Sequence, residues 1–155
     1  MASTSAGAAR VKSMKPRQKI LGYVVTRDAW PMVGLAVLNA LRNGVSHVVI
    51  VDHRSNNKTH QYLRDLQHSR PDEISLIRTN TTHFLQSATY VSVLKHFPID
   101  DYDWVYTFDS DEFIYVNDDR KLSDSLNDVS QDVNAIRYEV INFVVPNNFD
   151  STNAA

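Results

Sequence analysis

The chain of 155 residues has the length of a single domain, and its 43% hydrophobic residues suffice for a buried core. It contains no cysteine, which excludes a disulfide scaffold, a thiolate metal site and a cysteine nucleophile. Residues 1–27 carry six basic and no acidic side chains, so the rest of the chain has a net charge of −8, which argues against nucleic-acid binding. No apolar run approaches the roughly 20 residues of a membrane helix and no secretory signal is present, so we expect a cytoplasmic protein without a transmembrane segment.

The first third of the chain predicts a strand, a helix and a second strand. Residues 1–18 are basic and poor in apolar side chains, which predicts a disordered arm. Residues 20–26 form a β-branched apolar run, typical of a strand covered on both faces. The apolar residues 32–41 follow Pro31 and predict a buried helix that ends at Asn43 and Gly44. Residues 45–51 predict the second strand.

The middle of the chain repeats this pattern. Tyr62, Leu63 and Leu66 have the spacing of one helical face, and residues 74–77 predict a third strand. Apolar residues recur at helical spacing from residue 84 to 94, which predicts a third helix that runs to about residue 96, and residues 104–108 predict a fourth strand. The alternation predicts an α/β fold with a mostly parallel sheet between layers of helices.

The pattern changes after the fourth predicted strand. We expect a short strand over residues 113–116, a short helix over 122–129 and an extended segment over 135–145. Residues 146–155 are polar and predict a flexible tail. The predicted domain therefore spans residues 19–145.

Polar side chains follow each predicted strand. Thr26 ends the first strand, Asp52 the second, Arg78 the third and Asp109 the fourth. In a parallel sheet the carboxyl ends of the strands meet at one edge, where ligands bind. We therefore expect these residues to gather at one site.

Asp109 and Asp111 form an acidic doublet after a hydrophobic strand. On an extended segment, residues two apart point the same way, with Cα atoms ~6.5 Å apart. Two such carboxylates repel unless a cation lies near, and oxygen ligands suit Mg²⁺ or Mn²⁺, which can stabilise a diphosphate leaving group. The alternative is that both are solvated turn residues at a strand end.

A second interpretation of the doublet is enzymatic. Residues 105–111 resemble the first motif of haloacid dehalogenase-like phosphatases, in which the first Asp is a nucleophile and the second an acid/base. That motif usually opens its domain, whereas three predicted strands come first here. We rank this interpretation second.

Three blocks of the sequence, residues 24–28, 41–55 and 104–113, together resemble family-2-type glycosyltransferases of the GT-A fold, in the branch with a D-x-D-E-F metal motif. The resemblance implies a three-layer sandwich with a mostly parallel sheet. It also implies metal-dependent transfer of a sugar from a nucleoside-diphosphate sugar (UDP- or GDP-linked) to the hydroxyl of a carbohydrate or other acceptor.

The resemblance also implies roles for individual residues. Thr26 would border the nucleobase pocket, Asp52 would accept a hydrogen bond from the base or ribose, and Arg78 would lie near the nucleotide. Asp109 would face the ribose or a metal-bound water, and Asp111 would ligate the metal. The implied nucleotide-binding set is Thr26, Asp52, Arg78, Asp109 and Ser110, and the implied ligands of Mn²⁺ or Mg²⁺ are Asp109 and Asp111.

The catalytic base is not identified by the sequence. In the family it follows the metal motif, where this chain is short, so we expect a truncated or minimal enzyme that holds the donor half. A non-catalytic nucleotide-sugar-binding module is the alternative. The six histidines form no zinc-hydrolase pair, and each, His60 included, is interpreted as a surface or loop residue; His53 and His83 are partial exceptions because they fall near predicted strand ends.

Overall fold

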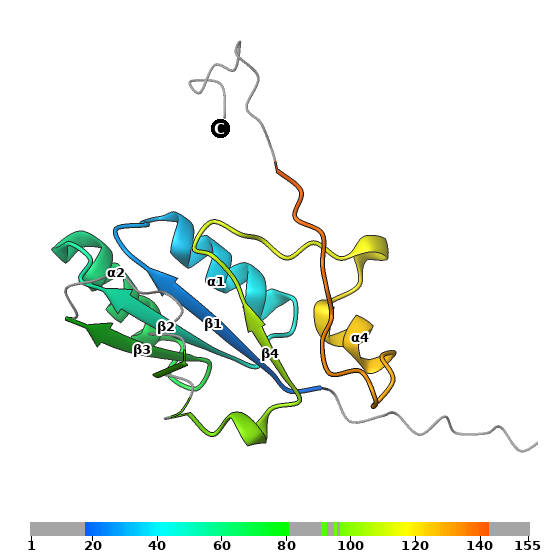
Figure 1. Ribbon diagram of the computed structural model, residues 1–155. Coiled ribbons are helices and arrows are strands. Elements are labelled where there is room, and N and C mark those ends of the chain that lie inside the picture. Colours follow the sequence, from blue (N-terminus) through cyan, green and yellow to red (C-terminus); the bar gives the residue numbers. More distant parts are fainter. Residues whose placement is uncertain (1–17, 81–90, 93–94, 96, 143–155) are drawn as a thin grey trace, which may run out of the picture.

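The computed structural model describes residues 18–80, 91–92, 95 and 97–142. Within these residues, four parallel strands form one sheet with the order β3-β2-β1-β4 (Figure 1). The strands are β1 (Ile20–Thr26), β2 (His47–His53), β3 (Ile74–Thr79) and β4 (Trp104–Thr107). The expected α/β fold with a parallel sheet is confirmed.

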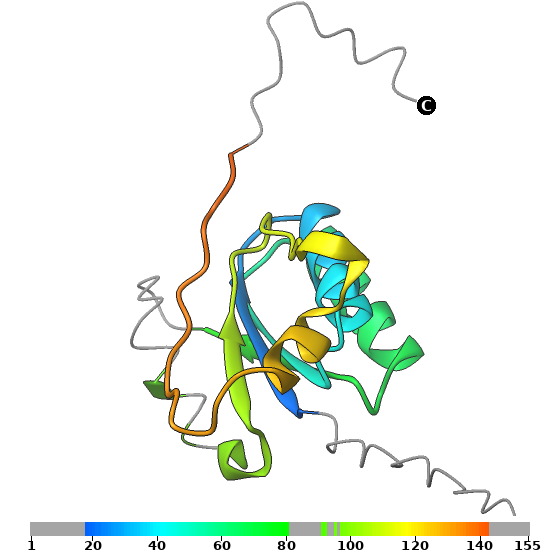
Figure 2. The ribbon, with the colours of Figure 1, turned by 90° about the vertical axis from the view of Figure 1, so that its right-hand side faces the viewer.

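Helices cover one face of this sheet. They are α1 (Met32–Arg42), α2 (Asn57–Ser69) and the short α4 (Leu122–Asn127), and Figure 2 shows all three on the same side of the strands. Two 3₁₀ turns, η1 (Ile99–Asp101) and η2 (Asn117–Asp119), precede β4 and α4. Helix α1 ends where it was expected to, since Gly44 follows it with a φ of 90°.

The sheet contributes side chains to two apolar clusters, one on each face. Val24 and Ile50 pack under the helices with Val37 of α1, Leu63 of α2 and Leu126 of α4. The alternate residues of the same strands form the second cluster: Leu21, Tyr23, Val25, Val49 and Val51. Because successive strand residues point to opposite faces, the continuous apolar runs of β1 and β2 reflect burial on both sides.

The strand order explains why α1 and α2 share a face. The steps from β1 to β2 and from β2 to β3 go in one direction, and right-handed crossovers then put both helices on the same side. The connection from β3 to β4 runs back past β1 and belongs on the opposite side. Phe97 and Tyr102, at the end of that connection, do pack on the second cluster. The third predicted helix lies almost entirely outside the described residues, so the helical layer expected there stays a prediction.

The segment after β4 differs from the expectation. The predicted strand over residues 113–116 is wrong, because this segment pairs with no strand in the described part of the chain. The backbone of Ile114 instead forms two hydrogen bonds with the side chain of Asn39 in α1. Asn39 Oδ1 accepts from Ile114 N at 2.7 Å, and Asn39 Nδ2 donates to Ile114 O at 3.3 Å. The predicted helix over 122–129 is confirmed as α4, whereas residues 135–142 of the expected extended segment belong to no strand.

At its amino end, the described chain is attached to the domain through Gln18. Its backbone N–H donates to Asn127 Oδ1 at 3.3 Å, and its side chain accepts from Trp104 Nε1 at 3.1 Å. Gln18 had been assigned to the arm. The rest of the predicted arm and the predicted tail lie outside the described residues. Within the described ranges, no helix is long and apolar enough to cross a membrane.

Candidate functional site

The carboxyl edge of the sheet brings three of the predicted site residues side by side. Thr26 pairs in register with Asp52, and Asp52 pairs with Arg78. Residues in register on parallel strands point to the same face, which here is the face of α1 and α2. The row Thr26–Asp52–Arg78 therefore lies where α2 begins, as the pattern of strand ends predicted.

The order in which the parallel strands are added to the sheet reverses at β1. Strands β2 and β3 follow on one side of β1, while β4 lies on the other. In open α/β sheets the crevice at such a switch point is the usual ligand site. Thr26 ends β1 at this point, and the acidic doublet follows the neighbouring strand β4, so both predicted parts of the site lie at the same edge of the sheet, beyond adjacent strands.

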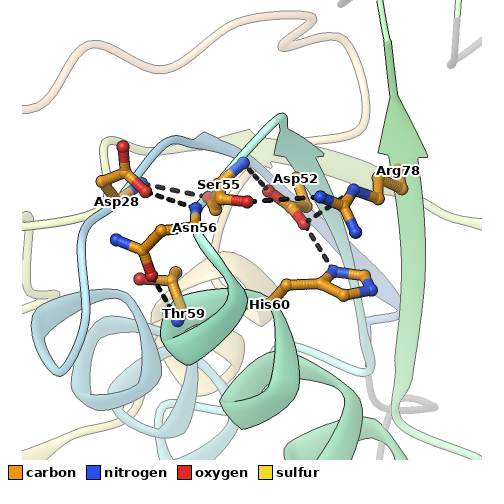
Figure 3. A network of polar contacts seen from close by, with 7 residues as sticks. All are labelled: Asp28, Asp52, Ser55, Asn56, Thr59, His60 and Arg78. Atoms are coloured by element: carbon orange, nitrogen blue, oxygen red, sulfur yellow. Dashed lines mark hydrogen bonds and ion pairs between the residues drawn. The ribbon is translucent and has the colours of Figure 1, made fainter.

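Asp52 is the centre of a polar cluster (Figure 3). Its side chain is 0% exposed, its Oδ1 accepts from Ser55 N at 2.9 Å, and its Oδ2 lies 2.6 Å from His60 Nδ1 and 3.8 Å from Arg78 Nε. Since a carboxylate only accepts, His60 Nδ1 carries the proton and donates it. A buried carboxylate is tolerated because charged and hydrogen-bonding partners surround it.

The loop after β2 is joined to the loop after β1. Asp28 N donates to Ser55 Oγ at 3.0 Å, and Asn56 N donates to Asp28 Oδ1 at 2.6 Å. Asn56 in turn caps α2, since its Oδ1 accepts from Thr59 N at 2.9 Å. Asp28 and Arg54 have positive φ values of 54° and 57°, a conformation that side chains rarely adopt and that these hydrogen bonds hold in place. Both loops therefore form one preorganised rim.

The acidic doublet lies on a turn and not on an extended segment, so the premise of the spacing argument is wrong. Strand β4 ends at Thr107. Glu112 N then donates to Asp109 O at 3.1 Å, and Asp109 N donates to Glu112 Oε2 at 3.1 Å. Asp109 and Asp111 are exposed and Ser110 is half-buried in this turn. The turn is followed at once by Ile114, which Asn39 binds, so the position of the turn is fixed from α1.

Aromatic side chains border the acidic turn. Tyr106 stacks on Phe108 with ring centroids 5.1 Å apart, and Tyr138 lies against Tyr106 at 6.2 Å. Burial, and then the neighbouring Tyr138 and Glu112, raise the pKa of Tyr106 well above its ordinary range. Burial and the carboxylates of Glu112 and Asp109 also raise the pKa of Tyr138. Tyr138 therefore faces the acidic turn, and both phenols stay protonated at neutral pH.

Two features test whether the residues fit a metal and a nucleotide. The described residues contain no group of three metal-ligating side chains, so a metal here would have only Asp109 and Asp111 as the predicted side-chain ligands. That donor set fits Mg²⁺ or Mn²⁺, which bind one or two carboxylates together with water and substrate phosphates. The buried Thr26 Oγ1 also has no hydrogen-bond partner within the described part of the chain.

Several residues of this site were missed. His60 was interpreted as a surface or loop histidine, which is wrong, since it is 21% exposed and bound to Asp52. Asp28 and Asn39 accept hydrogen bonds from backbone groups 28 and 75 residues further along the chain, and no local pattern signals such contacts. Ser55 had a weak signal, because an Asp at a strand end commonly closes a turn by accepting a hydrogen bond from a nearby backbone N–H.

Comparison with known proteins gives a structural likeness. No protein-family model and no curated protein matches the chain. Among solved structures, it is similar to the mannosyltransferase PcManGT from Pyrobaculum calidifontis, determined in complex with GDP-Man and Mn²⁺. The two share 20% sequence identity and a TM-score of 0.55, over 66% of this chain and 30% of that one. The likeness shows a shared fold, and the match spans less than a third of that protein's length.

Proposed function

We propose that this chain is the nucleotide-sugar-binding part of a metal-dependent glycosyltransferase. The observation that carries the proposal is the arrangement at the switch point of the parallel sheet: the row Thr26–Asp52–Arg78 runs from β1 across β2 and β3, and the acidic turn follows β4, the neighbour of β1 on the other side. The fold it shares with a mannosyltransferase solved with GDP-Man and Mn²⁺ supports it. The D-x-D-E-F motif of residues 109–113 supports it independently.

The row supplies the nucleotide end of the proposed site. Arg78 is 40% exposed and brings a positive charge to the edge of a domain that is acidic overall. The unpartnered hydroxyl of Thr26 favours a polar ligand, because a buried hydroxyl without a hydrogen bond costs about 1–3 kcal/mol. We assign Thr26, Arg78, Asp109 and Ser110 to contacts with the nucleotide. Asp52, which the resemblance implies as a direct hydrogen-bond acceptor, is buried, so we assign it to the site as the carboxylate that holds its neighbours in place.

The acidic turn supplies the diphosphate end. Asp109 and Asp111 would hold Mn²⁺ or Mg²⁺, which, when bound, would neutralise charge that develops on a departing nucleoside diphosphate. The hydrogen bonds between Asp109 and Glu112 hold the turn closed, and the contact of Asn39 with Ile114 positions it. Preorganisation of this kind lowers the entropy lost when a ligand is ordered.

The experiment is a binding measurement on the whole chain. Isothermal titration and thermal unfolding would be carried out with Mn²⁺ alone, with GDP-mannose alone and with both, and repeated with a UDP-sugar. We expect a nucleotide sugar to bind only with Mn²⁺ and to stabilise the fold by about 2.7 kcal/mol at 100 times its Kd. No binding of either nucleotide sugar in the presence of Mn²⁺ would refute the proposal.

Two variants make the test specific. Asp111→Asn is expected to abolish the binding of the nucleotide sugar that requires Mn²⁺. Asp100→Asn removes another exposed carboxylate, in η1 before β4 begins, and is expected to leave binding unchanged. Release of the nucleoside diphosphate would then indicate an enzyme, and binding without turnover a binding module. Metal-dependent hydrolysis of simple phosphate esters, without nucleotide-sugar binding, would instead support the phosphatase.

A further inference from the structure

Asp52 lies too deep to contact a ligand directly. Its side chain is 0% exposed, and both of its oxygens already accept hydrogen bonds, from Ser55 N at 2.9 Å and from His60 Nδ1 at 2.6 Å. The bond to Ser55 also holds the turn through Arg54, whose φ is positive. A ligand could reach this carboxylate only by displacing His60 or opening that turn. Asp52 therefore acts through the groups it holds.

His60 is the group that Asp52 orients. The ring is 21% exposed, and its Nδ1 proton is committed to Asp52 Oδ2. This bond fixes the orientation of the ring and places a proton on Nδ1, so in the neutral ring the lone pair is on Nε2. In Figure 3, Nε2 points away from Asp52, and it has no hydrogen bond to any residue that the structure describes. Nε2 is therefore an oriented acceptor.

Arg78 provides donors beside this acceptor. Its Nε lies 3.8 Å from Asp52 Oδ2, the same oxygen that accepts from His60, and its Nη2 donates to Ser55 O at 3.3 Å. The guanidinium has five N–H groups, and 40% of the side chain is exposed, so other donors remain for a ligand. His60 Nε2, an acceptor, and Arg78, a cationic donor, thus belong to two side chains that contact the same buried carboxylate. They lie at the edge of the sheet where β1 ends at Thr26.

We propose that His60 and Arg78 bind the ribose of the nucleotide, and that Asp52 is a positioning residue that fixes His60. A ribose hydroxyl can donate to His60 Nε2 while its oxygen or a neighbouring oxygen accepts from Arg78. This pairing uses the neutral ring, whose Nδ1 proton is bonded to Asp52 and whose Nε2 accepts. The proposal rests on the proposed function and identifies which side chains of that site contact the sugar of the nucleotide.

The positioning role is tested without any ligand. Long-range ¹H–¹⁵N NMR correlations of the imidazoles report which ring nitrogen carries the proton. We expect His60 to be the Nδ1–H tautomer in the wild-type protein, and Asp52→Asn to abolish this preference. A wild-type His60 that carries a proton on Nε2, on that nitrogen alone or on both, would overturn the proposal even if Asp52→Asn fails to fold.

The ribose contact is tested with nucleotide analogues. Binding of GDP and of UDP, each with Mn²⁺, is compared with binding of the 2′-deoxy and 3′-deoxy analogues. For the wild-type protein we expect loss of one of these hydroxyls to weaken binding about three- to tenfold, the usual effect of one hydrogen bond. In His60→Asn, the amide nitrogen keeps a donor close to the place of Nδ1 while Nε2 is lost. We expect this variant to bind the parent nucleotide about three- to tenfold more weakly and the deoxy analogue no more weakly than the parent.

A matched control and two distinct failures complete the experiment. His68→Asn changes an exposed histidine of the same helix, whose Nδ1 contacts Arg64 O at 2.9 Å, and is expected to leave nucleotide binding unchanged. If His60→Asn discriminates the deoxy analogue as strongly as the wild type, the ribose proposal is wrong while the proposed function stands. If the wild type binds neither GDP nor UDP with Mn²⁺, both are wrong.

Discussion

Replacing Gly34 with alanine is expected to destabilise the protein, although alanine is the better helix former. A Cβ at Gly34, in α1, would lie 1.9 Å from Tyr62 Oη and 2.5 and 2.6 Å from two ring carbons. The whole ring must therefore move, which disturbs its packing on the core and its edge contact with Trp30 at 6.4 Å. Overpacking costs about 1–3 kcal/mol and a lost aromatic contact about 0.5–1.5 kcal/mol. The helix gains about 1 kcal/mol, so steric overlap decides the sign.

We expect a net loss of about 2 kcal/mol, which corresponds to a fall in Tm of about 4–8 °C for a chain of this size. Thermal and urea unfolding followed by circular dichroism would measure it. The decisive control is the same substitution in a Tyr62→Ala background. With the ring absent, only helix propensity remains, and Gly34→Ala is expected to stabilise by about 1 kcal/mol. An equal effect in both backgrounds would refute the steric argument.

Three further predictions concern the site. Asn39→Ala removes the hydrogen bonds to both backbone groups of Ile114, so we expect the free energy of unfolding in urea to fall by about 1–3 kcal/mol and Mn²⁺ to bind more weakly. The control Ser46→Ala removes one hydrogen bond at the amino end of β1 and should lower stability without affecting Mn²⁺ binding. Asp52→Ala removes a buried carboxylate from its partners and is expected to cost about 3 kcal/mol in the same assay; a loss below about 1 kcal/mol would contradict its structural importance. The pKa of Tyr106 is raised on folding, so the native state keeps a proton that the unfolded chain loses above pH 10.0; stability should fall as the pH rises beyond that value, and Tyr106→Phe should reduce the fall.

Much of the fold followed from local patterns. The continuous apolar run of β1, the apolar helix α1 and the glycine that ends it were predicted almost to the residue, because burial on two faces and the left-handed stop leave local signatures. The second strand begins two residues later than expected, at His47. Val45 N still donates to Ala40 O at the end of α1, so its backbone belongs to the helix terminus.

The alignment of the strand ends was predicted, whereas the hydrogen bonds around them were not. Thr26, Asp52 and Arg78 were expected together because parallel strands share a carboxyl edge, and the register of the sheet aligns them. The doublet was expected on an extended segment and lies on a turn, since Glu112 accepts from Asp109 N. No sequence pattern revealed this bond.

The amino-acid order settles whatever depends on neighbours in the chain: the alternation of strands and helices, the stop at Gly44, and the polar residue at the end of each strand. Three-dimensional packing decides whatever depends on which distant groups meet. Asn39 binds Ile114 across 75 residues of sequence, and this contact turns a predicted strand into an irregular segment that positions the acidic turn. Backbone and buried polar groups must each find a partner, and their partners come from whichever elements the fold brings near. For that reason the contact of His60 with Asp52 depends on the fold, which brings α2 to the end of β2.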